Sequence, residues 1–157
     1  MRNSVIMVCA AGILATAAYA EPVSPSAVSY MEGAVEQSLS GTAGDAANGR
    51  VIMGDNSQGN CVACHQITEM SDVAFQGEIG PMLDGAGDRW TEGQLRGIVS
   101  NAKLMFEDSI MPAFYKTDGF TRPGNVYTGK AADDTFGPLL SAQQIEDVVA
   151  YLVTLKD

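Results

Sequence analysis

The stretch that decides the fold reads Cys61-Val62-Ala63-Cys64-His65. It places two thiols close together and an imidazole directly after the second thiol. The C-x-x-C-H order is typical of covalent haem attachment, in which each thiol forms a thioether with a vinyl group of the porphyrin and the histidine binds the iron. Because the spacing is local, one short helical turn can supply all three groups.

Two thiols in a C-x-x-C pair also occur in redox dithiols and in half of a zinc site. A zinc site would need two further cysteine or histidine ligands, whereas Cys9 is the one other cysteine of the chain and His65 is its single histidine. A thioredoxin-like dithiol would need a βαβ context, and no strand pattern leads into Cys61. The sequence therefore predicts one covalent haem c, bound by Cys61 and Cys64, with His65 as an iron ligand.

The beginning of the chain indicates export. Arg2 precedes an apolar run over 5–18 that is too short to cross a bilayer comfortably, and 18–20 form a small-x-small cleavage site. We expect residues 1–20 to be a secretory signal peptide, with Cys9 lost on cleavage. No later apolar stretch is long enough for a membrane helix. The sequence thus predicts a soluble protein of the periplasm, given a Gram-negative source.

The chain is strongly acidic. It has 19 acidic residues against 9 basic ones, a formal net charge of −10 that becomes −11 when Arg2 leaves with the signal. Such a surface repels nucleic acid and anionic lipid, and it attracts positively charged partners. We therefore expect neither nucleic acid nor a membrane among its partners.

Two helices are expected in the first third of the mature chain. Ser24-Pro25 has the pattern of a helix start, and an amphipathic helix is predicted from there to Gly41. Residues 21–44 are thus interpreted as a helical extension with a linker. A second helix is predicted over about 45–53. The apolar stripe of the first helix would consist of Val28, Met31, Val35 and Leu39.

Two further helices are predicted from capping boxes that begin at Thr91 and Ser141, each with a glutamine three residues later. No alternating strand pattern is present. Residues 66–90 and 103–138 are aperiodic and would be long for loops of a compact domain, unless they wrap a large apolar group such as haem. The sequence predicts an all-α, class I-like cytochrome c fold over 45–157, with three to four helices and long loops around one haem.

The sixth position on the iron needs a second ligand. Methionine is expected there, because the chain has no other histidine and thioether ligation is usual in electron-carrying haem proteins. Met111 is the main candidate, since it lies in an aperiodic loop that can cross to the far side of the ring and Pro112 blocks a helix there. Met82 and Met105 are alternatives. The remaining methionines are expected in the core or too close to the histidine: Met31, Met53 and Met70.

Other residues are candidates for supporting the haem. A ligating histidine usually donates its second ring N–H to a carbonyl or carboxylate, and the carbonyl of Pro81 in the Gly80-Pro81 loop is the candidate acceptor. An ordinary turn is the alternative interpretation. Arg50, Arg89 and Trp90 are candidate partners of the haem propionates, or else ordinary surface groups.

Several stretches, in their order and spacing, resemble the SoxX family, the monohaem cytochrome c subunits of the bacterial thiosulfate-oxidising (Sox) system. The resemblance covers about residues 45–157. The haem motif and the Gly-Pro-x-Leu turn are shared by many small cytochromes c, whereas the stretches that begin at Leu95 and at Met111 are more particular to SoxX. These stretches are Gly59–His65, Gly80–Gly85, Leu95–Val99, Met111–Tyr115 and Leu140–Leu152.

The resemblance implies a heterodimer with a SoxA-like cytochrome c. Such a complex is an L-cysteine S-thiosulfotransferase, which oxidatively couples thiosulfate to a cysteine of a SoxYZ-like carrier and releases two electrons. The present chain would be its electron-transfer subunit, passing electrons to a small acceptor cytochrome. By position, Cys61 and Cys64 would anchor haem, and His65 and Met111 would ligate iron. No catalytic residue is expected in this chain.

Two other functions remain open from the residues alone. A free-standing periplasmic shuttle cytochrome c would share every haem-site residue. A resident partner would bury the N-terminal helix and the loop around Phe114, Tyr115 and Phe120, whereas a shuttle would fold them back. A haem sensor or peroxidase-like enzyme would have a labile sixth ligand and would bind cyanide or carbon monoxide rapidly.

Overall fold

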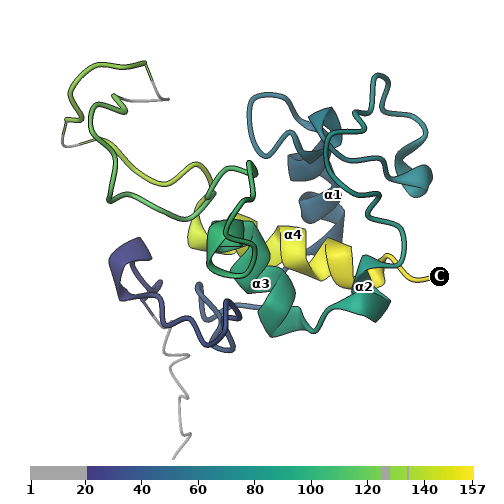
Figure 1. The fold of residues 1–157 in the computed structure, drawn as a ribbon. Coiled ribbons are helices and arrows are strands. Elements are labelled where there is room, and N and C mark those ends of the chain that lie inside the picture. Colours follow the sequence, from purple (N-terminus) through teal and green to yellow (C-terminus); the bar gives the residue numbers. More distant parts are fainter. Residues whose placement is uncertain (1–20, 125–127, 134) are drawn as a thin grey trace, which may run out of the picture.

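The computed structural model describes residues 21–124, 128–133 and 135–157, and the expected signal peptide at 1–20 lies outside these ranges. The described part is all-α, as predicted, and no helix within it is long and apolar enough to reach across a bilayer. An isolated antiparallel bridge joins Met31 and Ala34. The α-helices are α1 (Ala46–Gly54), α2 (Ala86–Arg89), α3 (Glu92–Asn101) and α4 (Ala142–Thr154), and 3-10 turns form at Pro25–Ala27, Cys61–Ala63, Thr68–Met70 and Ala102–Leu104 (Figure 1).

Side-chain caps begin the three longer helices, and those of α3 and α4 are the ones that the sequence predicts. The Asp45 carboxylate accepts hydrogen bonds from the backbone N–H groups of Ala47 and Asn48 in the first turn of α1. Complete capping boxes begin α3 at Thr91 and α4 at Ser141. Each cap satisfies N–H groups that have no partner inside the helix, so the sequence alone fixes where each helix begins. The short helix α2 was not predicted; it follows Gly85, whose φ is +70°.

The core forms around α4, which packs against each of the other three α-helices. In Figure 1 α4 runs through the middle of the molecule, with α1 behind it and α3 in front. Gly49 allows the close approach of α1, because a Cβ there would lie 1.9 Å from the carbonyl oxygen of Asp147. The face of α4 that is fully buried carries Ile145, Val148 and Val149.

The helix predicted from Ser24 to Gly41 is wrong. The structure has one 3-10 turn, Pro25–Ala27, and the chain then reverses where Glu32 and Gly33 take positive φ. The serines and valines of this segment are weak helix formers, so contacts with the rest of the protein decide its conformation. Met31 is 73% exposed and is not a core residue.

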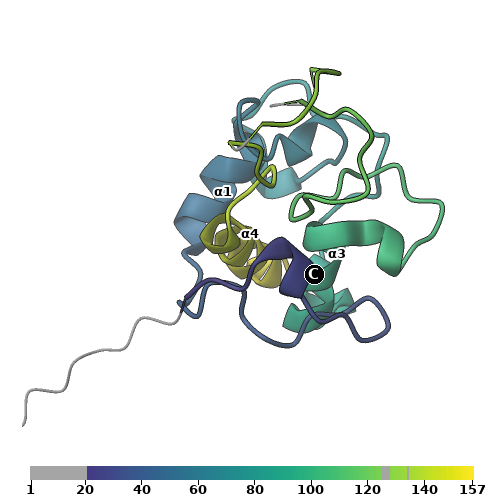
Figure 2. The same cartoon turned by 90° about the vertical axis from the view of Figure 1, so that its left-hand side faces the viewer.

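Residues 21–44 are joined to the domain by backbone hydrogen bonds to a buried ion pair of α3 and α4, and they lie along these two helices (Figure 2). Arg96 Nε is 2.9 Å from Glu146 Oε1, and both side chains are 4% exposed. Arg96 also donates to the carbonyl of Val35 at 2.9 Å, and the Leu39 N–H donates to Glu146 at 2.6 Å. The segment is therefore part of the same core rather than a helical extension.

Candidate haem site

The C-x-x-C-H stretch forms the short helical turn that its spacing predicts. Asn60 takes a left-handed conformation and leads into the 3-10 turn Cys61–Ala63. The N–H groups of Cys64 and His65 donate to the carbonyl of Cys61 at 3.1 and 3.0 Å. This local pairing brings both thiols and the imidazole onto one turn. The two thiols are free rather than joined as a disulfide.

The environment of Cys61 argues against a redox dithiol. Its side chain packs against the hydrophobic core, and burial raises the pKa of the thiol to about 12. A reactive dithiol needs the opposite, a thiol whose pKa lies near or below neutral pH. Among the described residues, no three His, Cys, Asp or Glu side chains gather to hold a metal ion.

The imidazole of His65 is oriented by the loop at 80–81. Its Nδ1–H donates to the carbonyl oxygen of Pro81 at 2.6 Å, so the hydrogen bond expected there is present. A donor at Nδ1 leaves Nε2 with the lone pair that binds a metal. The carbonyl of Cys64 accepts from the Gly80 N–H at 2.7 Å and ties this loop to the thiol turn.

Gly80 is a functional residue whose reason the sequence did not reveal. A Cβ at this position would lie 2.3 Å from His65 Cε1 and 2.6 Å from Nδ1. Glycine is therefore required for the loop to lie flat against the ring. The Gly-Pro pair was a visible signal, but only the fold shows that the missing side chain makes room for the imidazole.

The candidate propionate partners already have protein partners in the structure. Arg50 forms an ion pair with Asp72 on the surface. Arg89 donates to the carbonyls of Met82 and Asp84, at 3.1 and 2.6 Å, and so supports the loop that carries Pro81. The Trp90 ring packs edge-on against Phe106, with centroids 5.8 Å apart. Contact of these side chains with a propionate stays a prediction.

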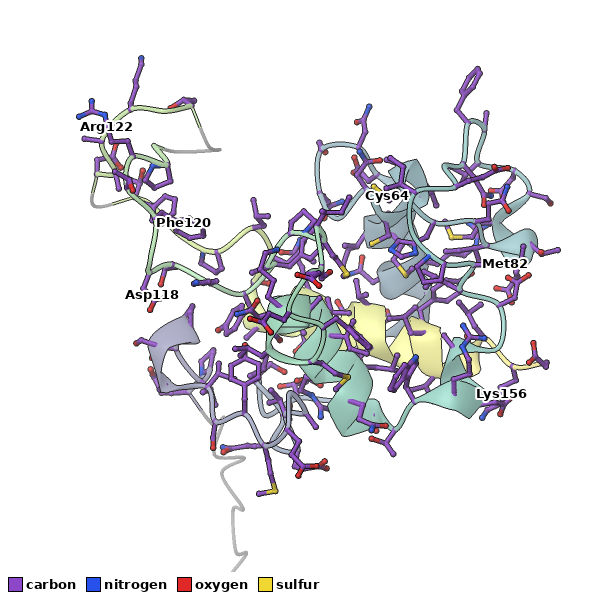
Figure 3. The ribbon with its side chains drawn as sticks, in the orientation of Figure 1. Cys64, Met82, Asp118, Phe120, Arg122 and Lys156 are labelled. Carbon is purple, nitrogen blue, oxygen red and sulfur yellow. The ribbon has the colours of Figure 1, made fainter. Side chains whose placement is uncertain are left out.

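The methionines differ in their burial and in the residues that surround them. Met82 directly follows Pro81, on the side of the imidazole, and is 48% exposed on the opposite side of the molecule from Phe120 (Figure 3). Met105 lies against Gly33, because a Cβ added to Gly33 would lie 2.7 Å from the Cβ of Met105. The core encloses two more methionines, Met53 and Met70.

Met111 is half-buried and packs against the hydrophobic core. Its N–H donates to Ser109 Oγ at 3.2 Å, and its carbonyl accepts from Lys103 Nζ at 2.8 Å. The N–H of Tyr115 donates to the carbonyl of Ser100 at 3.0 Å and closes the loop onto α3. A role for Lys103 was not predicted, because a lysine eight residues before a methionine forms no recognisable pattern.

Comparisons with known proteins agree with this site. The family model described as cytochrome c matches residues 46–156. This chain belongs to the cytochrome c family. It is 61% identical to a chain of the solved structure entitled "Crystal structure of SoxXA from P. pantotrophus", with a TM-score of 0.83, covering 87% of this chain and 99% of that one. The resemblance to SoxX is confirmed. A search of curated proteins finds no match.

The residues present fit the haem c that this family carries. The thiol turn has two free sulfurs, and the imidazole of His65 has an open Nε2. The loop at 80–81 supports this imidazole from one side. When bound, haem c supplies an iron centre that gains and loses one electron. Electron transfer is accordingly the activity of this class of protein.

Proposed function

We propose that this chain is the electron-transfer subunit of a SoxXA-like complex. Cys61 and Cys64 bind haem c covalently, and His65 and Met111 ligate its iron. The observation that supports the site most directly is the bond from His65 Nδ1 to Pro81, which directs the other ring nitrogen outward for a metal. Among the methionines that the structure describes, Met111 combines partial burial with a backbone held at both polar groups.

The proposed ligand pair favours electron transfer over bond-making chemistry. A haem with histidine and methionine on opposite faces has no open position for a substrate. The chain's own residues contribute orientation: Pro81 fixes the imidazole, and Cys61 and Val62 of the thiol turn pack against the hydrophobic core. We therefore infer that no residue of this chain carries out sulfur chemistry.

The attachment is tested by mass spectrometry of the mature chain produced with a c-type maturation system. We expect the mass of the polypeptide plus one haem, retained under denaturing conditions. The double variant Cys61→Ala, Cys64→Ala should have the mass of the polypeptide alone. Haem that is lost from the wild-type chain on denaturation would contradict covalent attachment.

We further propose that the partner is a SoxA-like cytochrome c. The likeness to a chain of a SoxXA structure supports this partner. Oxidative coupling of thiosulfate to a carrier cysteine releases two electrons, whereas one haem accepts one at a time, so either two successive steps or a second redox centre is needed. The SoxYZ-like carrier and a small acceptor cytochrome would then bind transiently. Residues 1–20 would direct this assembly to the periplasm.

A specific observation favours the free-standing shuttle as a second candidate. Phe114 and Tyr115 are 7% and 4% exposed, so they fold back into the chain's own core, as expected for a shuttle. Phe120 instead lies in the arm, the name used here for the described residues of 116–138. The arm extends away from the helices (Figures 1 and 3). The arm is the part of that loop still available to a partner.

Gel filtration distinguishes the two candidates. The haem-loaded mature chain is run alone and with a SoxA-like cytochrome, beside the variants Phe120→Ala in the arm and Phe75→Ala, which removes an exposed aromatic from a different loop. We expect co-elution of wild type and Phe75→Ala with the partner and weaker association of Phe120→Ala. A wild-type chain that stays monomeric with the partner would support the shuttle.

A further inference from the structure

Met111 is held at both of its backbone polar groups. Its N–H donates to Ser109 Oγ at 3.2 Å, and its carbonyl accepts from Lys103 Nζ at 2.8 Å. Pro112 follows with a restricted φ and no N–H of its own. The backbone around the Met111 Cα is thus restrained on each side before any ligand is present.

The contact with Lys103 is not an incidental surface ion pair. Glu107 and Asp108 follow within five residues in a strongly acidic chain, yet Lys103 forms no ion pair with either of them in the part that the structure describes. The exposed ammonium donates to a neutral carbonyl instead. Ordering a lysine side chain costs conformational entropy, and a charge-assisted hydrogen bond offsets that cost.

We propose that Lys103 is a positioning residue that holds the thioether of Met111 on the iron. The inference rests on the proposed role of Met111 as a ligand. Lys103 lies at the end of α3, in the 3-10 turn Ala102–Leu104, and its bond spans the loop that leads to Met111. A loop that is already ordered pays less entropy when its methionine binds, so competing ligands displace that methionine less easily.

The test measures how strongly imidazole binds the ferric, haem-loaded mature chain, followed by its visible spectrum. The variants are Lys103→Ala, Lys103→Arg and the control Lys130→Ala, which removes the same charge from the exposed arm. Loss of one hydrogen bond of ordinary strength should raise imidazole affinity about fivefold in Lys103→Ala. Lys103→Arg keeps a donor, so it and the control should stay close to wild type.

Equal imidazole affinity in Lys103→Ala and wild type would overturn the inference. An equal rise in Lys103→Ala and Lys130→Ala would also overturn it, since the effect would then be one of charge alone. If Lys103→Ala does not load haem, Lys103→Leu, which has no donor, is compared with Lys103→Arg, which keeps one, and equal affinities in these two would be the contradicting result.

The proposed ligand has its own control. The charge-transfer band of a ferric iron–thioether bond should be absent from Met111→Ala. A band that persists there removes the role of Met111, and with it this inference, whatever Lys103 does. If the band is lost from Met111→Ala while the imidazole affinity of Lys103→Ala equals that of wild type, only the positioning role of Lys103 is removed.

Discussion

The contact between Gly80 and His65 makes a sharp prediction for the substitution Gly80→Ala. The added Cβ would lie 2.3 Å from His65 Cε1, against an optimum of about 3.5 Å for two carbon atoms, so ring and loop must separate by about 1.2 Å. That movement is large enough to break the 2.6 Å bond from His65 Nδ1 to Pro81.

The expected cost follows from these two effects. Overpacking a site of this kind costs about 1–3 kcal/mol, and a lost hydrogen bond adds about 1 kcal/mol. The free energy of unfolding of the haem-loaded chain should therefore fall by about 2–4 kcal/mol. Because the strained ring is the proposed iron ligand, the ferric spectrum should also show a fraction of molecules with a weakened or missing histidine bond.

Guanidinium unfolding followed by the visible spectrum provides the assay. Gly137→Ala is the matched control, since a Cβ there would meet no atom within 4 Å. We expect the control to unfold like wild type and Gly80→Ala to unfold at lower denaturant. If Gly80→Ala matched Gly137→Ala in both midpoint and spectrum, the argument that glycine makes room for the imidazole would be refuted.

Two further predictions concern stability. Glu146→Ala leaves the buried Arg96 without its main partner, so the free energy of unfolding should fall by about 3–5 kcal/mol. Glu92→Ala removes the exposed partner of the same arginine, so it should lower the free energy of unfolding by less than about 1 kcal/mol. Equal losses in denaturant unfolding would contradict the importance of the buried pair. Burial and the bond to Glu69 raise the pKa of Tyr151 from 10.0 to about 12. The native state therefore keeps this proton after the unfolded state has lost it, so the stability linked to Tyr151 is complete below pH 10 and declines between pH 10 and 12. The difference in unfolding free energy between wild type and Tyr151→Phe should shrink over that range, and a constant difference would count against the assignment.

Local signals account for what the sequence predicted correctly. The thiol turn, the caps at Thr91 and Ser141, and the helix α4 all depend on residues within a few positions of each other. The acceptor role of Pro81 was also accessible, because ligating histidines generally need a second partner and a rigid Gly-Pro loop supplies one.

Long-range contacts account for what the sequence missed. Residues 21–44 take their conformation from Arg96 and Glu146, whose positions in sequence lie far away, so the apolar stripe was mistaken for a helix. The hydrogen bond from Lys103 to Met111 and the contact of Gly80 with the imidazole are equally invisible to periodicity. Each depends on how two loops pack, which local propensity does not determine.

We infer that one iron is bound by both His65 and Met111, and that the chain moves single electrons. The most direct measurement is the absorption spectrum of the ferric mature chain, recorded for wild type, Met111→Ala and Met82→Ala. We expect the iron–thioether charge-transfer band in wild type and in Met82→Ala and its loss in Met111→Ala. A wild-type spectrum without this band, or a band that persists in Met111→Ala, would contradict it.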